Sequence, residues 1–481
     1  MDPAGAVISW RRLSYFLSIL LLIQCFFLYY IGSSRPHALT LNKPLPKRPT
    51  RLSEISPLAV GLPDLESVTK ANVSDEYFFN EHVDVLSAEQ CKTAFPDLYY
   101  EAERSSAYWR NRRHLISSND IWADEIGGSI RFLIHRNELR IINSTNAFSA
   151  VGVMERAKGI TELIYRAVES ARAGGEALPT IEFSVSMSDI SEPPTPWDTY
   201  TTWTWARAIV DVEEQRRKKQ QRLWIMPNFD HYAMTDRNMG AFEDVRYRAF
   251  QHDSPLPDKI PKVVWRGTLW VNPALRGGLI NTTVNATWAD VREVKWGTAD
   301  HEGHLKVDQF CDYHFAVHTE GISFSGRLKF LLNCDNVIIM PELTWTEHYY
   351  HLLIDSGPQQ NYVKVKRDWS DLEEQVKSYL ANPFLSNMIV KNHKATFRDR
   401  YLTRAATSCY LRRLMQEYGS VSFRPPVDEE IHHGNRTSTG KKAVRKRGIS
   451  FEELMLAPRD FANVTDYHGK DADGRWTVDD Y

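Results

Sequence analysis

The sequence has little of what defines several specialised protein classes. Only 5 of its 481 residues are cysteine, glycine and proline contribute 24 and 23, and no internal repeat or coiled-coil heptad is evident. These shortages exclude collagen-like, wholly disordered and disulfide-framework chains. Charge of one sign is also lacking, because 59 Lys+Arg against 61 Asp+Glu leave a net charge of -2. The chain therefore offers no bulk basic surface for nucleic acid, and its partners must be read from local patterns.

Long hydrophobic runs are scarce as well, with one exception. A mean hydropathy of -0.43 excludes a protein with many membrane spans. Residues 13–34 nevertheless carry no charge, and about 20 apolar residues cross a ~30 Å hydrocarbon core. The bulky FFLYYI segment of this run lacks a small-x-small site, which favours a transmembrane signal anchor over a cleaved signal peptide. Arg11 and Arg12 before it predict a cytosolic tail over 1–12 and a lumenal position for the rest.

Sequons and cysteines agree with a lumenal position. Four cysteines follow the anchor, an even number that predicts disulfides in an oxidising compartment. Three pairings are open to them, and buried free thiols are the alternative. The four cysteines are Cys91, Cys311, Cys334 and Cys409, and the Asn-x-Ser/Thr sequons lie at Asn72, Asn143, Asn281, Asn285, Asn435 and Asn463.

The pattern after the anchor predicts an α/β protein. Residues 35–85 are rich in proline and read as a stem. A helix is expected from Ser87, which with Gln90 forms a capping box, and helices are also expected over 157–173 and 392–418. Strands alternating with helices imply parallel sheets. The expected strands cover 180–189, 262–267, 312–320, 336–342 and 362–368, and a polar tail is expected over 425–481.

A loop between an expected strand and helix is the most informative local feature. In HTEGISFSGRLKF, Gly321, Ser325 and Arg327 lie where backbone N–H groups and a helix dipole would converge on an anion. The guanidinium of Arg327 suits paired phosphate oxygens. The loop matches neither the P-loop nor the dinucleotide fingerprint, which lowers support for ATP or NAD. A loop of this composition can also serve turn geometry alone.

Other polar residues are weaker candidates. Arg266 at a strand end and Arg276 ten residues later could offset a diphosphate, and Asp189 at a strand's carboxyl end could act as a base. Each could equally be a surface or turn residue. The histidine pairs 314/318 and 348/351 have no third ligand, and the D-x-D at 471–473 has no strand before it, so no metal site is predicted.

Three blocks in this order resemble glycosyltransferase family 90, the group of fungal capsule-associated xylosyltransferases and Rumi-type protein O-glucosyltransferases. They are VSMSD, KIPKVVWRGTLWVNPALR and CDYHFAVHTEGISFSGRLKFLLNCDNVIIM, within a region from about 91 to 418. The resemblance implies a GT-B-like fold of two Rossmann-like domains whose parallel sheets face a cleft. The domains would be an acceptor-side one over 86–260 and a UDP-sugar-binding one over 261–424. No metal or cofactor besides the UDP-xylose or UDP-glucose donor is implied.

The resemblance also implies residue roles. Asp189 matches the general base, and Gly267 and Gly321 would permit close backbone approach to the donor. Glu347 is assigned to donor ribose or sugar hydroxyls, and Asn228 departs from an aspartate that fungal relatives often have. Cysteine pairing would be Cys91–Cys409 and Cys311–Cys334. Arg266, Ser325 and Arg327 match the residues that hold the diphosphate. Arg276 matches a further position of the family.

These observations predict a type II membrane enzyme of the Golgi that transfers xylose or glucose with inversion from a UDP-sugar to a glycan or protein hydroxyl. The final residues, VDDY, are not an ER retrieval tetrapeptide, which favours the Golgi over the ER. The alternative is a non-catalytic, membrane-tethered carbohydrate-binding or scaffold protein of the same fold. A lumenal hydrolase would need a second placed carboxylate. The basic run 441–447 reads as a solvated loop, with processing after Lys446–Arg447 as an option.

Overall fold

The computed structural model describes residues 85–112, 114–148, 151–193, 199–209, 214–234, 239–295, 304–430 and 444–456. All of them belong to one unit, Asn72–Tyr481. The predicted cytosolic tail, the anchor over 13–34, nearly all of the stem, three sequons (Asn72, Asn435, Asn463) and the D-x-D at 471–473 lie outside the described residues. Within the described ranges, no helix combines the length and the apolar character needed to cross a membrane.

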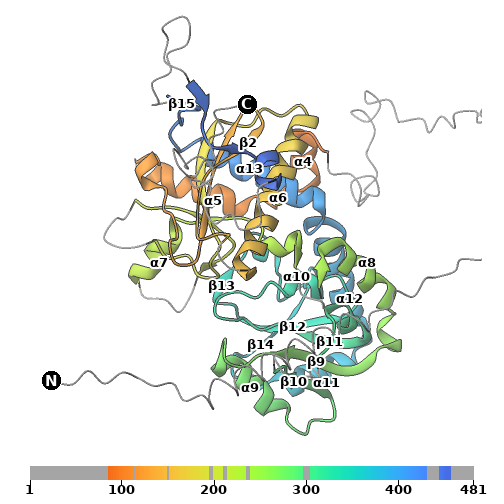
Figure 1. The fold of residues 1–481 in the computed structure, drawn as a ribbon. Helices are drawn as coiled ribbons and strands as arrows, with labels where there is room; N and C mark the ends of the chain where they lie inside the picture. Colours follow the sequence, from red (N-terminus) through yellow and green to blue (C-terminus); the bar gives the residue numbers. More distant parts are fainter. Residues whose placement is uncertain are drawn as a thin grey trace, which may run out of the picture. The chain divides into compact units, whose positions relative to one another are not determined.

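The first lobe is built on a six-stranded sheet with the order β17-β2-β1-β3-β4-β6 (Figure 1). Strand β1 pairs antiparallel with β2 and β3, whereas β3, β4 and β6 run parallel. This sheet is therefore mixed, which corrects the prediction of parallel sheets in both domains. The antiparallel pairing of β1 and β2 results from a two-residue hairpin, Arg136–Asn137, with φ angles of 50° and 56°. The turn contains no glycine, so the sequence lacked the usual signal for it. The strands are β1 Ser129–His135, β2 Glu138–Thr145, β3 Ile181–Ser186, β4 Trp203–Thr204, β6 Trp224–Ile225 and β17 Ile449–Ser450.

Helices cover this sheet where the sequence provides stop signals. Ser87 and Gln90 form the predicted capping box of the first described helix, which ends before Pro96. The long helix over 151–173 ends at Gly174–Gly175, and Gly175 adopts φ +70°. Contributing helices are α4 Ala88–Ala94, α5 Tyr100–Asn111, α6 Val151–Ala173, α7 Glu214–Gln221, α13 Arg404–Gly419 and α14 Phe451–Leu456.

The second lobe contains a five-stranded, wholly parallel sheet with the order β10-β9-β11-β12-β14 (Figure 1). Neighbouring residues of β9 alternate between two apolar cores, with Val263 and Trp265 in one and Val264 in the other. Both faces of the sheet are therefore buried, as in doubly wound α/β folds. Its strands are β9 Ile260–Gly267, β10 Ala289–Glu293, β11 Tyr313–Val317, β12 Val337–Pro341 and β14 Val363–Val365, and its helices are α8 Phe242–His252, α9 Pro273–Thr283, α10 Leu328–Leu331, α11 Leu372–Ala381 and α12 Pro383–His393.

After the second lobe, the chain returns to the first lobe. The prediction instead placed a closing helix in the second domain. The single helix expected over 392–418 is interrupted by a π-helical segment, Lys394–Tyr401, and restarts where Thr403 caps α13. Helix α13 buries Tyr410, Leu414 and Tyr418 in the core of the first lobe. The boundary expected at residue 424 therefore does not separate the two lobes.

Part of the expected polar tail is folded. Strand β17 pairs with β2, and Ile449 and Phe451 are buried in the first-lobe core. Lys446 pairs with Glu138 at 2.7 Å and Arg447 with Glu182 at 2.8 Å. The dibasic pair therefore holds this segment on the sheet and does not lie in a solvated loop, so a cut there would separate residues that pack together.

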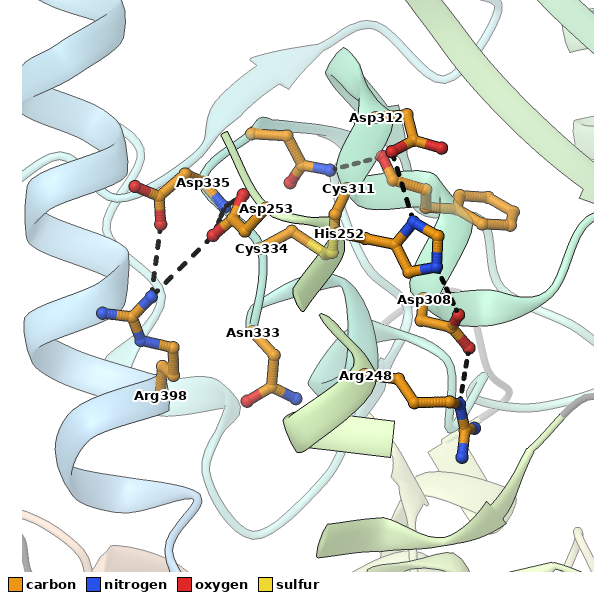
Figure 2. Close-up of a disulfide and its surroundings, with 12 residues drawn as sticks. Arg248, His252, Asp253, Asp308, Cys311, Asp312, Asn333, Cys334, Asp335 and Arg398 are labelled. Atoms are coloured by element: carbon orange, nitrogen blue, oxygen red, sulfur yellow. Dashed lines mark hydrogen bonds and ion pairs between the residues drawn. A yellow bond between two sulfur atoms is a disulfide. The ribbon is translucent and has the colours of Figure 1, made fainter. Parts of the chain in front are cut away.

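Two disulfides join the pairs that the resemblance implied. Cys91 in α4 is bonded to Cys409 in α13 within the first lobe. Cys311 and Cys334 close a 23-residue separation that contains β11 and the Gly/Ser loop (Figure 2). Beside this second bond, His252 lies between Asp308 at 3.4 Å and Asp312 at 3.5 Å.

Short elements complete the described chain and join the lobes. Ala208 of β5 pairs with Trp345 of β13, so a two-stranded ribbon links the first lobe to the second. Of the sequons within the described ranges, Asn281 and Asn285 are exposed, while Asn143 lies half-buried in β2. The short elements are β5 Arg207–Ala208, β7 Ala233–Met234, β8 Gly240–Ala241, β13 Trp345–Thr346, β15 Asp428–Glu430, β16 Val444–Lys446 and the turns of helix Ser118–Asp120, Phe229–His231, Leu256–Asp258, Val307–Asp312 and Tyr350–Leu352.

Candidate functional site

A cavity of about 520 Å³ collects most of the predicted site residues. Its first-lobe wall follows the ends of parallel strands β3 and β6, and its second-lobe wall follows β9 and β11. Asp189 thus shares one space with the predicted donor-binding residues. The wall residues used below are Arg156, Asp189, Phe229 and Asp230 from the first lobe, and Arg266, Gly267, Trp270, Arg276, Gly321, Ser323, Ser325, Gly326 and Arg327 from the second.

Topology explains why the second-lobe residues meet. The sheet order places β10 and β11 on opposite sides of β9, so the connections after β9 and β11 turn away from each other. A crevice opens at such a switch point, outside the carboxyl ends of the strands, and ligands of open α/β sheets bind there. Arg266 and Gly267 end β9, and the loop 318–327 follows β11. The crevice therefore lies between the two segments that the sequence singled out.

Arg266 is held in place by internal partners. Its Nη2 lies 2.8 Å from Oδ2 of Asp290, and its Nη1 donates to the carbonyl oxygen of Trp265 at 2.9 Å. Tyr313 donates to the same Asp290 oxygen at 2.6 Å. Burial alone would raise the pKa of Asp290, but these bonds lower it. The guanidinium of Arg266 is thus held in one orientation, and its charge is paired with that of Asp290.

Arg276 and Arg327 differ from Arg266 because neither has a carboxylate within 4 Å among the described residues. Arg276 donates to the carbonyl oxygens of Glu320 at 3.0 Å and Thr268 at 2.8 Å, and Arg327 donates to that of Arg266. Burial lowers the pKa of each to about 10, and the charge of Arg327 adds to the effect on Arg276. Both remain cationic at neutral pH, so the cavity holds two positive charges without an internal counter-ion.

His318 lies at the start of the same loop. In the sequence it was a candidate only as a metal ligand together with His314. It is 1% exposed, and neither ring nitrogen has a hydrogen-bond partner in the described chain. Burial, together with the charges of Arg327 and Arg276, lowers its pKa to about 3. The imidazole is therefore neutral and adds no further charge beside the two arginines.

Asp189 stands on the opposite wall, three residues after β3. Its Oδ1 accepts from Nη1 of Arg156 at 2.9 Å, while Oδ2 lies 3.4 Å from Nη2. The side chain is 42% exposed, so the carboxylate is oriented and still accessible. Ser323 of the second-lobe loop donates to the carbonyl oxygen of Asp189 at 2.7 Å, which joins the two walls. The sequence did not identify Arg156, because it lies 33 residues away in the middle of helix α6.

Glycines allow the loop 318–327 to approach its neighbours closely. A Cβ on Gly326 would collide with Oδ2 of Asp230, and one on Gly267 would lie 2.8 Å from the Trp265 ring. The predicted helix after the loop is only the four residues of α10, which corrects the expected contribution of a helix dipole. Anion binding here depends on side chains and loop N–H groups.

A buried cluster lies at the seam between the lobes, and we call Asn228, Asp230, His231, Lys329, Glu347 and His348 the seam cluster. Glu347, predicted to contact donor hydroxyls, is 0% exposed and does not line the cavity. Its carboxylate accepts from Nδ2 of Asn228 at 3.0 Å and from Tyr350 at 2.7 Å. An ionised aspartate at this position could not donate this bond, which gives a reason for asparagine at position 228. The structure therefore places Glu347 in a supporting position instead of on the donor.

Burial shifts the pKa values within the seam cluster. It raises the pKa of Glu347 to about 8, although Lys329 opposes the shift, and it raises that of Asp230. It lowers the pKa values of His231 and His348 well below the usual value for histidine, and Lys329 contributes. Lys329 pairs with Asp230 and also donates to Asn228 at 3.1 Å. From the sequence, His348 was considered together with His351. It could not be grouped with His231, because His231 and Glu347 are 116 positions apart in the chain.

Comparison with known proteins identifies the family of this chain. A sequence model of the family described as Glycosyl transferase family 90 matches residues 215–461, just over half of the chain. Similar relatives are the rat proteins named Protein O-glucosyltransferase 3, 30% identical over 152 residues, and Protein O-glucosyltransferase 1, 29% identical over 136 residues. The zebrafish Protein O-glucosyltransferase 2 is 23% identical over 266 residues. These matches cover 30%, 28% and 52% of this chain and 29%, 33% and 49% of the relatives.

Proposed function

Because the chain belongs to glycosyltransferase family 90, we propose that it transfers a sugar from a UDP-sugar to an acceptor hydroxyl, with inversion at the anomeric carbon. The cavity between the two lobes is the reaction site. The donor diphosphate binds on the second-lobe wall, and the acceptor approaches from the side of Asp189. No metal ion is required on the diphosphate, because arginines supply the positive charge.

One observation carries this proposal. Arg276 and Arg327 line the same cavity, and neither guanidinium has a carboxylate partner in the described chain. The neutral imidazole of His318 lies near both. A diphosphate supplies the missing negative charge, and a guanidinium binds paired phosphate oxygens through its forked donors. Gly321, whose N–H donates to carbonyl oxygens within the loop, leaves room for close approach, and Ser325 offers a further hydroxyl donor. The cavity thus matches a small dianionic group better than a neutral sugar alone.

Asp189 is the general base in this proposal. Its carboxylate takes the proton of the acceptor hydroxyl as that oxygen forms a bond to the anomeric carbon, while the bond to the UDP oxygen breaks. Arg156 holds the carboxylate in one orientation through the 2.9 Å bond to Oδ1. Oδ2, with its longer contact, is the oxygen that faces the acceptor.

The arginines act on the leaving group. Negative charge grows on the UDP oxygen as the glycosidic bond breaks, and fixed cations at that position lower the barrier. Arg266 contributes through position, because Asp290 already balances its charge. Arg276 and Arg327 contribute through charge.

The finer features of the proposal come from several sources. UDP-glucose or UDP-xylose is the donor. The relatives' name, Protein O-glucosyltransferase, supports glucose as one of the two sugars. A glycan or protein hydroxyl is the acceptor. The uncharged run 13–34 and the lumenal sequons support a type II enzyme anchored in the Golgi membrane.

The test uses the full-length chain purified in detergent. It is incubated with UDP-glucose or UDP-xylose and a panel of glycan and peptide acceptors, and UDP release and product mass are measured. Asp189→Asn is compared with Asp244→Asn, which removes an exposed carboxylate in α8. We expect transfer with one donor by the wild type and Asp244→Asn, and a large loss in Asp189→Asn. UDP binding without turnover in all three proteins would instead support a non-catalytic sugar-binding protein.

A further inference from the structure

Three side chains of the seam cluster converge although they come from both lobes. His231 ends the short helix Phe229–His231 in the first lobe, whereas Glu347 and His348 follow β13 in the second. One ligand atom from each lies within 4.8 Å of the other two. The residues are 5%, 0% and 1% exposed. Two imidazoles and a carboxylate are a ligand set that divalent transition metals bind.

Three of the four imidazole nitrogens in this group lack hydrogen-bond partners in the described chain. Neither ring nitrogen of His231 makes a hydrogen bond in the described chain, and Nδ1 of His348 makes none. Leaving a buried polar atom unsatisfied costs about 1–3 kcal/mol, so native proteins seldom leave several together. The neighbouring rings do not remove this cost, because Phe242 and Tyr410 contact the two histidines through their faces or edges.

Charge in the seam cluster is also incomplete. Lys329 is paired with Asp230 and further bonded to Asn228 and to the carbonyl oxygen of Gly326. Glu347 has no ion-pair partner of its own in the described chain, only the two neutral donors Asn228 and Tyr350. These donors orient the carboxylate, as second-sphere groups do for metal ligands, and each oxygen keeps a further lone pair. A divalent cation would offset the charge of the Glu347 carboxylate and occupy the position between it and the unpartnered imidazole nitrogens.

We propose that His231, Glu347 and His348 bind one divalent transition-metal ion, best matched by zinc, which bridges the two lobes. A water completes a tetrahedral site, since zinc with three protein ligands keeps a fourth position. None of the three ligands lines the donor cavity, so the ion is structural and its role is separate from sugar transfer.

The experiment measures metal content in the full-length chain, purified in detergent without a histidine tag or chelator. Elemental analysis of the wild type should find about one zinc per chain, as expected for a site with three protein ligands. His231→Ala, His348→Ala and Glu347→Gln should each lower the content to below about a tenth of that value. His393→Gln is the matched control, because it alters a fully buried histidine that bonds to Asn336 outside the cluster. This control should retain the zinc.

A second measurement covers variants that fail to fold. The thermal midpoint of the wild type should fall after zinc is removed with a chelator and recover with zinc but not with magnesium. Cobalt added to the stripped wild type should give the visible bands of a tetrahedral site, and Glu347→Gln should shift or abolish them. A wild type that contains no zinc and takes none up on dialysis overturns the proposal. Zinc retained at wild-type level in His231→Ala and His348→Ala overturns it too. Sugar transfer is not a readout, so this result is independent of the proposed function.

Discussion

Buried arginines in the two lobes are compensated in different ways. In the first lobe, Arg207 pairs with Glu101 at 2.8 Å and Arg412 bonds Glu176 at 2.7 Å. In the second, Arg276 and Arg327 meet carbonyl oxygens but no carboxylate among the described residues. The first arrangement is complete in itself, whereas the second is complete only with an anion from outside. Arg266 on the same wall is paired with Asp290, so the absence of a carboxylate partner distinguishes Arg276 and Arg327 from the other arginines compared.

The largest expected effect isolates catalysis from this charge pattern. Asp189→Asn keeps the size of the side chain but removes the base, so the rate of transfer should fall by about 10²–10⁴. Its affinity for UDP should stay within about twofold, because the arginines on the opposite wall are unchanged. Steady-state kinetics with saturating donor, beside UDP calorimetry, test this. A drop in UDP affinity equal to the drop in rate would show that Asp189 serves the nucleotide instead.

Breaking a compensated pair should damage the fold. Arg207→Ala removes the hydrogen bonds of this guanidinium to the buried Glu101, which keeps Arg104 at 2.8 Å, so the free energy of unfolding should fall by about 1.5–3 kcal/mol. Chemical denaturation of the full-length chain measures the loss. The folded fraction should still bind UDP with near wild-type affinity. Unchanged stability would contradict the structural role that the pairing assigns to Arg207.

Removing an uncompensated arginine should have the opposite profile. Arg327→Ala should lower the transfer rate by about 10²–10³, as loss of one charge-stabilising donor does in other enzymes. Its unfolding free energy should change by no more than about 1 kcal/mol, because only a hydrogen bond to a carbonyl oxygen is lost. A destabilisation as large as that of Arg207→Ala would remove the contrast between the two kinds of arginine.

The disulfide that closes the loop should have only a small effect on UDP binding. Cys311→Ser with Cys334→Ser opens a loop of 23 residues, which costs about 3 kcal/mol by the loss of chain constraint. Arg327 lies within that loop, so UDP affinity should fall by only a few-fold while the loop still folds. Denaturation and UDP titration measure the two effects separately. No change in either would mean that the bond does not brace the site.

Local patterns were enough to predict part of this molecule. Apolar runs ending in Gly/Ser segments located the strands of the second sheet, and Ser87 and Gly175 marked helix ends, because these signals lie within a few residues of their effect. The residue pairing of the disulfides came from the family resemblance. The second-lobe wall of the cavity was predictable for the same reason, since it consists largely of two short segments after strands.

Long-range partners were not predictable from those patterns. The first sheet became mixed through a hairpin without glycine and through β17, which joins from about 300 residues away. Arg156 was hidden in a helix, and the group of His231, Glu347 and His348 forms only when the two lobes meet. In each case the chemistry depends on neighbours that the sequence places far apart.

The central claim, that the second-lobe wall binds a nucleoside diphosphate through uncompensated arginines, is tested most directly by calorimetric titration of UDP. The wild type, Asp189→Asn and Arg207→Ala should bind with similar affinity. The double variant Arg276→Ala with Arg327→Ala should bind at least about 10²-fold more weakly, since hydrogen bonds to charged groups contribute about 1.5–3 kcal/mol each. Equal UDP affinity in the double variant and the wild type, with both proteins folded, would contradict the account.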